Sequence, residues 1–324
     1  MSHIDEPIST IDTHTAGGPA RVVLSGLPPL TGETAAERMR DFQTNHDGLR
    51  KVLLNEPRGH RGMYGAVIGP SSDPNADLSV FFMTTGGYLP TCVHGSIGVA
   101  TALLEQGTLS PRPDGNLYFE TPGGVLRLRP RYRGNELGEI ALEMPPGFVI
   151  DPNVEIDVDG RAITAAAVFC GVPFLLVDAG QLGTSPDQTS LAFFVELGKA
   201  LLQKANAAPG NNFALALFYQ ALPGGGFQDV VIGRTGGIDR SPCGAGVGAL
   251  AVSEHAAGRL QIGDVLTVRG VIGTTFTGEI LRVEPAGSQA GAVPQVTGSA
   301  WVTGRHQFAL ADSDPLTEGF DLGV

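Results

Sequence analysis

Lysine is scarce in this chain of 324 residues, and its scarcity argues against two classes of enzyme. The only lysines are Lys51, Lys199 and Lys204, and the last two occupy polar positions of an amphipathic segment. A pyridoxal phosphate enzyme needs a buried lysine for its Schiff base, and none of these three has such a setting. The Gly-Lys-Ser/Thr loop that cradles nucleotide phosphates is also missing. We therefore expect a reaction that needs no cofactor.

Basic charge and cysteine are in short supply as well. The chain has 21 Lys and Arg against 33 Asp and Glu, a net charge of −12, which argues against nucleic acid and against anionic membranes, because both need basic residues to neutralise phosphates. A small anionic ligand is compatible with this charge, since a helix end concentrates a local field. Three cysteines make no disulfide framework and favour a reducing compartment. The start, MSHIDEPIST, lacks the profile of a signal peptide, so we expect a cytoplasmic protein.

The order of predicted elements occurs twice along the chain. The length suggests two domains, and Met-Pro-Pro-Gly at 144–147 marks a boundary. In each half, strands precede a long helix (34–50 and 190–206), and further strands flank a second helix (96–106 and 245–257). Strands are also predicted at 51–54 and 166–177, and a last strand at 301–308. The pattern predicts an α+β fold of two similar halves.

One short motif stands at the start of the second helix in each half. The first copy is TCVHGSIG at 91–98, and the second is DRSPCGAG at 239–246. In both, a cysteine ends an extended stretch and a glycine follows three residues later. The helices are expected to end at Gly107 and Gly258, equally far from their cysteines. Cys92 and Cys243 are therefore candidates for a pair that works together.

A thiol at a helix N-terminus faces unpaired N–H groups and the positive end of the helix dipole. Both favour the thiolate, so we expect the pKa of each thiol to fall below the ordinary value. One thiolate can remove an α-proton while the other thiol delivers a proton to the opposite face. The N–H groups placed to bind a substrate carboxylate between the two thiols belong to Val93, His94, Gly244 and Ala245.

Other interpretations of these residues stay open. Free cysteine is most often a buried apolar residue, and we assign no role to Cys170. Cys92 and His94 make only a two-residue fragment of a zinc site, so we expect no metal, and a redox pair would favour Cys-x-x-Cys. His94 and Asp239 are placed to contact a substrate amine; a helix cap and a turn or salt bridge are their structural alternatives.

The sequence resembles the proline racemase family, which includes proline racemases, 4-hydroxyproline 2-epimerases and trans-3-hydroxyproline dehydratases. The match is strongest in DRSPCG at 239–244 and extends to IDTHTAG at 11–17, EPRG at 56–59, GYL at 87–89 and VTGSAWVTG at 296–304. The resemblance implies a fold of the diaminopimelate-epimerase-like type, each half a curved sheet around a central helix, with the active site between the halves. It implies a first half of residues 1–145 with a C-terminal segment of about 300–324, and a second half of 146–299.

Carried over by residue, the resemblance implies that Cys92 and Cys243 are the acid/base thiols. It implies that Val93, His94, Gly244 and Ala245 hold the carboxylate, and that His94 and Asp239 flank the ring nitrogen. Members with dehydratase activity usually have threonine at the second cysteine, so Cys243 favours inversion. The chain departs from the usual pattern at Gly18, at Val93, where glycine is usual, and at Ala245, where threonine is usual.

The predicted function is a cofactor-independent racemase or epimerase that inverts Cα of proline or hydroxyproline. The alternatives are a trans-3-hydroxyproline dehydratase and a non-catalytic imino-acid binding protein. The expected partner is a small imino or amino acid, and a homodimer is left open.

Overall fold

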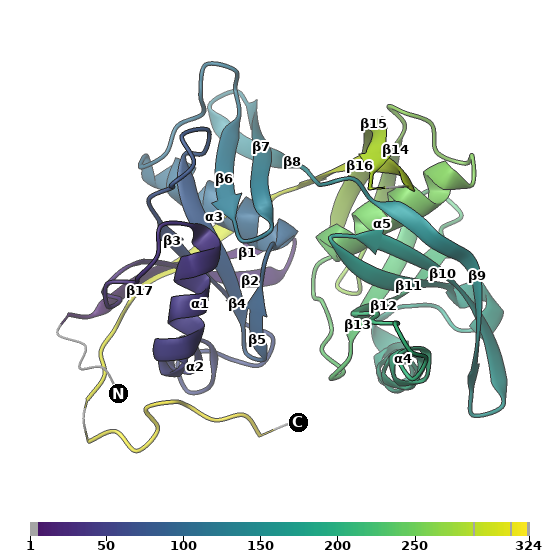
Figure 1. The fold of residues 1–324 in the computed structure, drawn as a ribbon, viewed down its shortest axis with the longest axis horizontal. Helices are drawn as coiled ribbons and strands as arrows, with labels where there is room; N and C mark the ends of the chain where they lie inside the picture. Colours follow the sequence, from purple (N-terminus) through teal and green to yellow (C-terminus); the bar gives the residue numbers. More distant parts are fainter. Residues whose placement is uncertain (1–5, 288, 312, 323–324) are drawn as a thin grey trace. The chain divides into compact units, whose positions relative to one another are not determined.

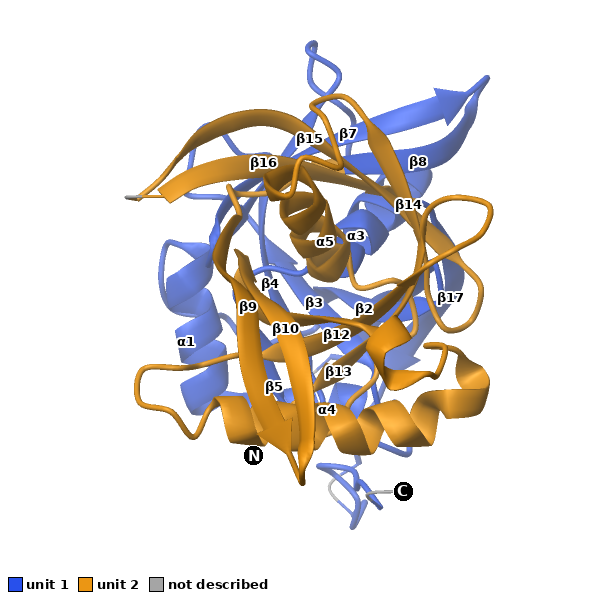
Figure 2. Ribbon diagram, turned by 90° about the vertical axis from the view of Figure 1, so that its right-hand side faces the viewer, with its two compact units in different colours: residues 1–141, 299–324 blue, residues 142–298 orange. Residues whose placement is uncertain are grey.

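Two compact units make up the chain, and they are coloured separately in Figure 2. Unit 1 comprises Met1–Ala141 and Ser299–Val324, and unit 2 comprises Leu142–Gly298. The computed structural model describes residues 6–287, 289–311 and 313–322 (Figure 1). Residues 1–5, 312 and 323–324 of the predicted first half and residue 288 of the predicted second half therefore lie outside the described residues.

Unit 1 is a curved sheet with helices on its two faces. Strands β17–β1–β2 are antiparallel, β2–β3 and β4–β6 are parallel, and β3–β4 and β6–β7 are antiparallel. A short strand, β5, pairs with β4. The bounds are β1 Ile8–Thr15, β2 Gly18–Ser25, α1 Ala35–Asn45, α2 Asp47–Leu54, β3 Tyr64–Gly69, β4 Leu78–Thr84, β5 Gly87–Leu89, α3 Val93–Gln106, β6 Leu117–Thr121, β7 Gly124–Arg133, β8 Glu136–Glu143 and β17 Ala300–Phe308.

Unit 2 repeats this order of pairings. Strands β9–β10–β11 are antiparallel, β11–β12 and β13–β14 are parallel, and β12–β13 and β14–β15–β16 are antiparallel. The bounds are β9 Phe148–Val158, β10 Arg161–Cys170, β11 Val172–Asp178, η1 Ala179–Leu182, η2 Gln188–Ser190, α4 Leu191–Ala205, β12 Leu215–Ala221, β13 Phe227–Gly233, α5 Gly244–Ala256, β14 Val265–Arg269, β15 Thr275–Ala286 and β16 Gln289–Gly298.

The parallel pairs explain why each unit needs two helical connections. A parallel pair requires a crossover, which is usually helical. In unit 1, α1 and α2 connect β2 to β3, and α3 connects β4 to β6. In unit 2, α4 connects β11 to β12, and α5 connects β13 to β14. The predicted duplication and the predicted α+β fold are thereby confirmed.

Helices α3 and α5 are the central helices of their units. In α5 every residue from Gly246 to Val252 is buried, and in α3 all residues from Val93 to Leu103 are buried. A helix that is apolar on all sides belongs inside a protein. Strands β1, β2 and β17 enclose α3, whereas β9, β10, β15 and β16 enclose α5.

The other helices cover separate cores on the outer faces of the sheets. In unit 2, α4 places Phe194, Leu197 and Leu201 against β12 and β13. In unit 1, α2 places Leu49, Val52 and Leu53 in a core of its own. None of the helices in the described residues is long and apolar enough to cross a membrane.

Several local predictions need correction. Residues 51–54 are not a strand but the end of α2, because Leu49, Val52 and Leu53 follow the spacing of a helix face. The predicted helix 34–50 is interrupted at His46. Its capping box of Thr34 and Glu37 is confirmed. The predicted strand 166–177 is a hairpin of β10 and β11, with Gly171 at a φ of 73° in the turn.

We predict that Gly248→Ala lowers the stability of unit 2. A Cβ at Gly248 of α5 would lie 2.9 Å from Cys170 Sγ and 2.9 Å from Met144 Sδ. Overpacking of this kind costs about 1–3 kcal/mol, although alanine's higher helix propensity offsets up to about 1 kcal/mol. The urea midpoint should therefore fall.

The matched background is Cys170→Ala, which removes one of the two obstructing sulfur atoms. In that background Gly248→Ala should cost less than in the natural chain. An equal loss of unfolding free energy in both backgrounds would show that the contact with Cys170 Sγ does not determine the effect of Gly248→Ala.

Candidate active site

The first thiol lies at the start of the central helix of unit 1. Cys92 is the N-cap residue of α3, with φ −151° and ψ 115°, and its Sγ accepts a hydrogen bond of 3.4 Å from the Gly95 N–H. Its side chain is buried, and Sγ lies 3.6 Å from Nδ1 of His94. The structure therefore brings Cys92 and His94 together, with Val93 as the buried first residue of the helix.

Neighbouring strands hold His94 in position. Its ring meets the ring of Tyr64 on β3 edge-on, with centroids 4.4 Å apart. Its backbone carbonyl accepts a 2.7 Å hydrogen bond from Thr15 Oγ1 at the end of β1. The imidazole is buried, so its orientation beside Cys92 is determined by packing as well as by the helix.

Asp12, in the IDTHTAG segment, takes part in a buried network that connects β1 and β2 to the neighbouring helix. Asp12 and Arg21 form a buried ion pair with Nη2 and Oδ2 2.8 Å apart. Arg21 also donates to the carbonyls of Leu53 and Arg58. The segment thereby ties β1 and β2 to α2 and the loop after it, a structural role.

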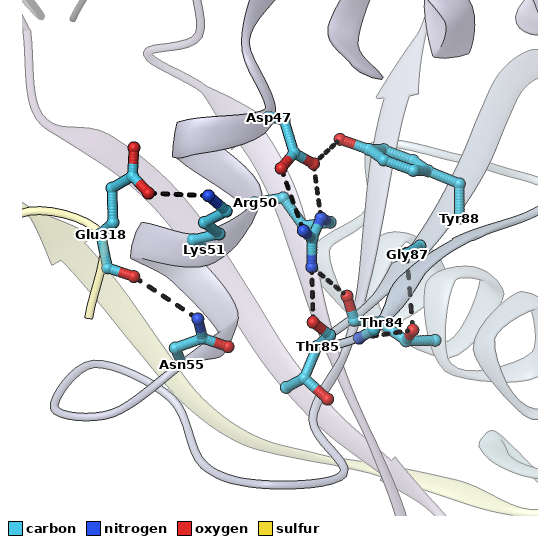
Figure 3. Close-up of polar contacts among 10 residues, drawn as sticks. Asp47, Arg50, Lys51, Asn55, Thr84, Thr85, Gly87, Tyr88 and Glu318 are labelled. Atoms are coloured by element: carbon cyan, nitrogen blue, oxygen red, sulfur yellow. Dashed lines mark hydrogen bonds and ion pairs between the residues drawn. The ribbon is translucent and has the colours of Figure 1, made fainter. Parts of the chain in front are cut away.

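A second network holds the strand that leads to Cys92. Arg50 of α2 pairs with Asp47 and donates to the carbonyls of Thr84 and Thr85, at 2.9 and 2.6 Å (Figure 3). Tyr88 donates to the same Asp47 carboxylate at 2.8 Å. These bonds fix the turn between β4 and β5, and β5 runs directly into the segment before Cys92.

The second thiol lies at the equivalent place in unit 2. Cys243 is the N-cap residue of α5, with φ −63° and ψ 118°. It is buried, the Asp239 side chain is hydrogen-bonded with it, and unlike Cys92 it accepts no capping hydrogen bond from the first turn of its helix. Gly244 is buried and Ala245 is half-buried in the first turn. The structure thus brings Asp239, Cys243, Gly244 and Ala245 together in this unit.

The expected fall in thiol pKa is wrong for Cys243. Burial, followed by the negative charge of Asp239, raises the pKa of Cys243 well above its ordinary value. The nearby backbone N–H of Gly246 favours the thiolate and lowers the pKa, but by less than burial and Asp239 raise it. Removal from water therefore outweighs the helix terminus here, and Cys243 is a protonated thiol at neutral pH.

The glycine three residues after each cysteine permits close packing. A Cβ at Gly95 would lie 2.9 Å from the Phe82 ring and 3.1 Å from Cys92 Sγ. A Cβ at Gly246 would lie 2.7 Å from Leu217 and 3.1 Å from Cys243 Cβ. Both helices therefore need glycine here to lie against the neighbouring strand and to fold back on the cysteine.

The remaining cysteine is structural, as its setting indicates. Cys170 is completely buried, and burial raises the pKa of its thiol to about 12. In the part of the chain that the structure describes, no group of three or more His, Cys, Asp or Glu side chains is arranged to hold a metal ion.

Sequence reasoning missed two residues near the thiols. Tyr64 packs on His94, and Asp229 of β13 is a buried acid that acts electrostatically on Cys243. Tyr64 belongs to no recognisable motif, and Asp229 is a single acidic residue in an apolar strand. The presence of one carboxyl group in an otherwise apolar strand could have indicated a functional residue, because buried acidic residues are rare unless they are paired.

Comparison with known proteins now identifies the family. A model of the proline racemase family matches residues 10–321. The chain belongs to the proline racemase family. It is 32% identical to the proline racemase of Acetoanaerobium sticklandii over 329 residues, which cover 97% of this chain and 98% of that protein. Membership in the proline racemase family makes the protein an isomerase of the racemase and epimerase type, as the sequence predicted.

Other proteins similar to this chain are named for reactions of hydroxyprolines. A trans-3-hydroxy-L-proline dehydratase of Bacillus cereus is 32% identical, over 97% of this chain and 98% of that protein. A crystal structure of a hydroxyproline epimerase from Agrobacterium vitis, with bound trans-4-hydroxy-L-proline, has a TM-score of 0.88 and 27% identity, covering 98% of this chain and 96% of that chain. The fold predicted from the family resemblance is therefore confirmed.

We predict that Arg50→Met destabilises unit 1 by about 2–4 kcal/mol. The change leaves Asp47 without its ion-pair partner and two carbonyl groups without a donor, and buried groups that lose a charged partner are costly. Urea unfolding measures the loss.

Lys51→Met is the control on the neighbouring residue. Lys51 pairs with Glu318 on the surface (Figure 3), and exposed pairs contribute less than about 1 kcal/mol. Equal losses in the two variants would contradict the role given to Arg50.

Proposed function

We propose that the protein inverts the α-carbon of proline or a hydroxyproline, with Cys92 and Cys243 as its two acid/base groups. The observation that carries the proposal is the duplication of one device. Each unit buries a central helix, and each of these helices has a cysteine as its N-cap residue. The names of its relatives in the proline racemase family supply the substrate class.

The first turns of α3 and α5 are the proposed binding groups for the substrate carboxylate. The first N–H groups of a helix have no partner within the helix, and the helix dipole favours an anion there. We assign the carboxylate to N–H groups of Val93 and His94 from α3 and of Gly244 and Ala245 from α5. This assignment uses backbone groups, so a net charge of −12 does not oppose it.

The imino nitrogen of the substrate is assigned to His94 and Asp239. Asp239 is four residues before Cys243 and is hydrogen-bonded with its thiol. A carboxylate here attracts the positively charged nitrogen of the substrate, and the His94 ring offers a further hydrogen bond. Binding the nitrogen beside Cα also holds the α-proton near the thiols.

The chemical step transfers two protons and changes no oxidation state. One cysteine thiolate takes the α-proton, and the electron pair of the Cα–H bond remains on Cα. The other thiol gives its proton to the opposite face of the same carbon and becomes a thiolate. The inverted product leaves, and the two cysteines have exchanged protonation states. Each cysteine therefore serves one stereoisomer.

The cellular setting belongs to the same proposal. All three cysteines are free, which supports a reducing, cytoplasmic location.

The test is an assay in heavy water without added cofactor. We expect the substrate α-hydrogen to exchange for deuterium. Proline and the cis- and trans-hydroxyprolines are the substrates to screen, by NMR and chiral chromatography. Both Cys92→Ser and Cys243→Ser should reduce inversion at least about a thousandfold, because a serine hydroxyl is a far weaker acid than a thiol and does not ionise to act as the base near neutral pH. The absence of exchange with every proline-type imino acid would refute the proposal.

Cys170→Ser is the matched control, because Cys170 is also buried but lies outside the proposed mechanism. Its inversion rate per folded molecule should equal that of the natural chain. A loss equal to that of the other two variants would indicate that cysteine replacement acts through folding.

The dehydratase among the relatives supports a second candidate, elimination of water from trans-3-hydroxyproline. That reaction needs a single base, which here would be Cys92. It predicts a cyclic imine product and tolerance of Cys243→Ser. The presence of Cys243 in the DRSPCG motif favours inversion over this alternative.

A further inference from the structure

Thr15 is a buried residue with a hydroxyl group that the proposed mechanism does not use. It is the last residue of β1, and its Oγ1 donates a 2.7 Å hydrogen bond to the carbonyl of His94. The hydroxyl group is the donor, because a carbonyl oxygen can only accept. A strand residue that precedes His94 by 79 positions in the chain therefore binds the first turn of α3.

The backbone around Thr15 holds this hydroxyl group in place. Thr15 pairs with Gly18 on β2 and with Ala300 on β17, so it has a strand on each side. The next residue in the chain, Ala16, donates its N–H to the carbonyl of Ser299 at 3.1 Å. Because threonine is also restricted at χ1, the hydroxyl group has little freedom to move away from the helix.

The helix α3 comes close to β1 because it has a glycine at the contact. A Cβ at Gly98 would lie 2.6 Å from Thr13 Oγ1 and 3.3 Å from Thr15 Oγ1. A larger residue at this position would push the helix away from the strand. The sequence thus supplies both sides of the contact, with hydroxyl groups on alternate residues of the strand and a glycine on the helix.

One peptide group connects the Thr15 hydroxyl group to the first thiol. The carbonyl of His94 and the N–H of Gly95 belong to the same planar trans peptide unit, in which they point in opposite directions. The carbonyl accepts from Thr15 at 2.7 Å, and the N–H donates to Cys92 Sγ at 3.4 Å. Hydrogen bonds in such a chain polarise one another, so the bond at the oxygen makes the N–H a stronger donor to the sulfur.

We propose that Thr15 is a positioning residue for the first thiol: through the peptide group that follows His94, its hydroxyl group strengthens the N–H to sulfur hydrogen bond that stabilises the thiolate of Cys92. Thr15 does not touch the substrate in this proposal. The thiolate gains more from the N–H donor than the neutral thiol does, because hydrogen bonds to charged groups are the stronger ones. The inference rests on the proposed two-thiol function, in which Cys92 takes the α-proton of one stereoisomer as a thiolate.

The second thiol has no such arrangement. In the described structure the side chain of Cys243 makes no capping hydrogen bond with the first turn of α5. A hydroxyl group that polarised a peptide group of that turn would therefore have no N–H to sulfur bond to strengthen. Removal of the Thr15 hydroxyl group should accordingly affect Cys92 and leave Cys243 unchanged.

The test compares the reactivity of Cys92 in the natural chain and in Thr15→Val, which removes the hydroxyl group and keeps the branched shape. Folded protein without substrate is treated with iodoacetamide from pH 6 to 10, and alkylation of each cysteine is followed by peptide mass spectrometry. At neutral pH the rate at Cys92 should fall about twofold, the factor expected when a hydrogen bond to a charged group loses about a fifth of its strength. The two rates should converge at pH 10, where ionisation no longer limits the reaction.

Three further variants separate the hydrogen bond from packing. Thr15→Ser keeps a hydroxyl group and should restore the natural profile of Cys92. Thr101→Val makes the same chemical change in α3, where Thr101 is buried and its Oγ1 has no hydrogen-bond partner in the described structure, so the profile should not change. Should Thr15→Val fail to fold by circular dichroism, Thr15→Ala provides a second variant without the hydroxyl group. The titratable neighbours His94 and Tyr64 are common to all these variants.

Coinciding Cys92 profiles in the natural chain and in a folded variant without the hydroxyl group would overturn the proposal. A loss of rate that persists undiminished at pH 10 would also overturn it, because a displaced helix start acts at every pH. The same holds for an equal change in Thr101→Val or for a failure of Thr15→Ser to restore the profile.

The outcome is separable from that of the proposed function. A changed Cys92 profile without α-proton exchange on any proline would sustain the role of Thr15 and refute the substrate assignment. Exchange with an unchanged profile would sustain the enzyme and refute the role of Thr15.

Discussion

The structure depends on burying two helices that begin at a cysteine. A buried helix must satisfy the N–H groups of its first turn without help from bulk water. In α3 the Cys92 sulfur accepts a hydrogen bond from the Gly95 N–H, whereas in α5 the Cys243 side chain makes no such capping bond. The remaining N–H groups of each first turn are the natural partners of an anion. The constraint that makes the fold stable therefore also makes each helix start a place for a carboxylate.

The duplication gives two similar helix starts, but their surroundings differ. Cys92 has an imidazole 3.6 Å from its sulfur, whereas Cys243 has the side chain of Asp239 beside it. Carboxylates disfavour a neighbouring thiolate, and an imidazole does not oppose one in the same way. A two-thiol mechanism needs this inequality, because two thiolates could not supply a proton and two thiols could not remove one. The helix dipole alone would have made the two cysteines alike.

Much of this molecule could be predicted from local sequence patterns. The helices α3 and α5 and the duplicated order of elements could both be predicted from hydrophobic periodicity and from glycine turns. The second half of α2, residues 51–54, was predicted as a strand because its Val-Leu-Leu run is as typical of a strand as of a helix, and tertiary packing decides between them. The raised pKa of Cys243 could not be predicted, because it depends first on burial, which follows from the packing of α5 against the surrounding strands, and then on the charge of Asp239.

The departures from the family pattern at Val93 and Ala245 have a physical explanation. A carboxylate bound to a helix start is held by backbone N–H groups, which valine and alanine retain as well as glycine or threonine does. Val93 is the buried first residue of α3 and Ala245 is half-buried in the first turn of α5, so these side chains alter the shape of the surroundings and leave the donors in place. Gly95 and Gly246 cannot be replaced in the same way, because a Cβ at either position would collide with a side chain of a neighbouring strand and with the cysteine three residues before it. The substitutions therefore leave the backbone donors of the proposed carboxylate site unchanged, whereas the packing of each helix requires the glycine of Cys-x-x-Gly.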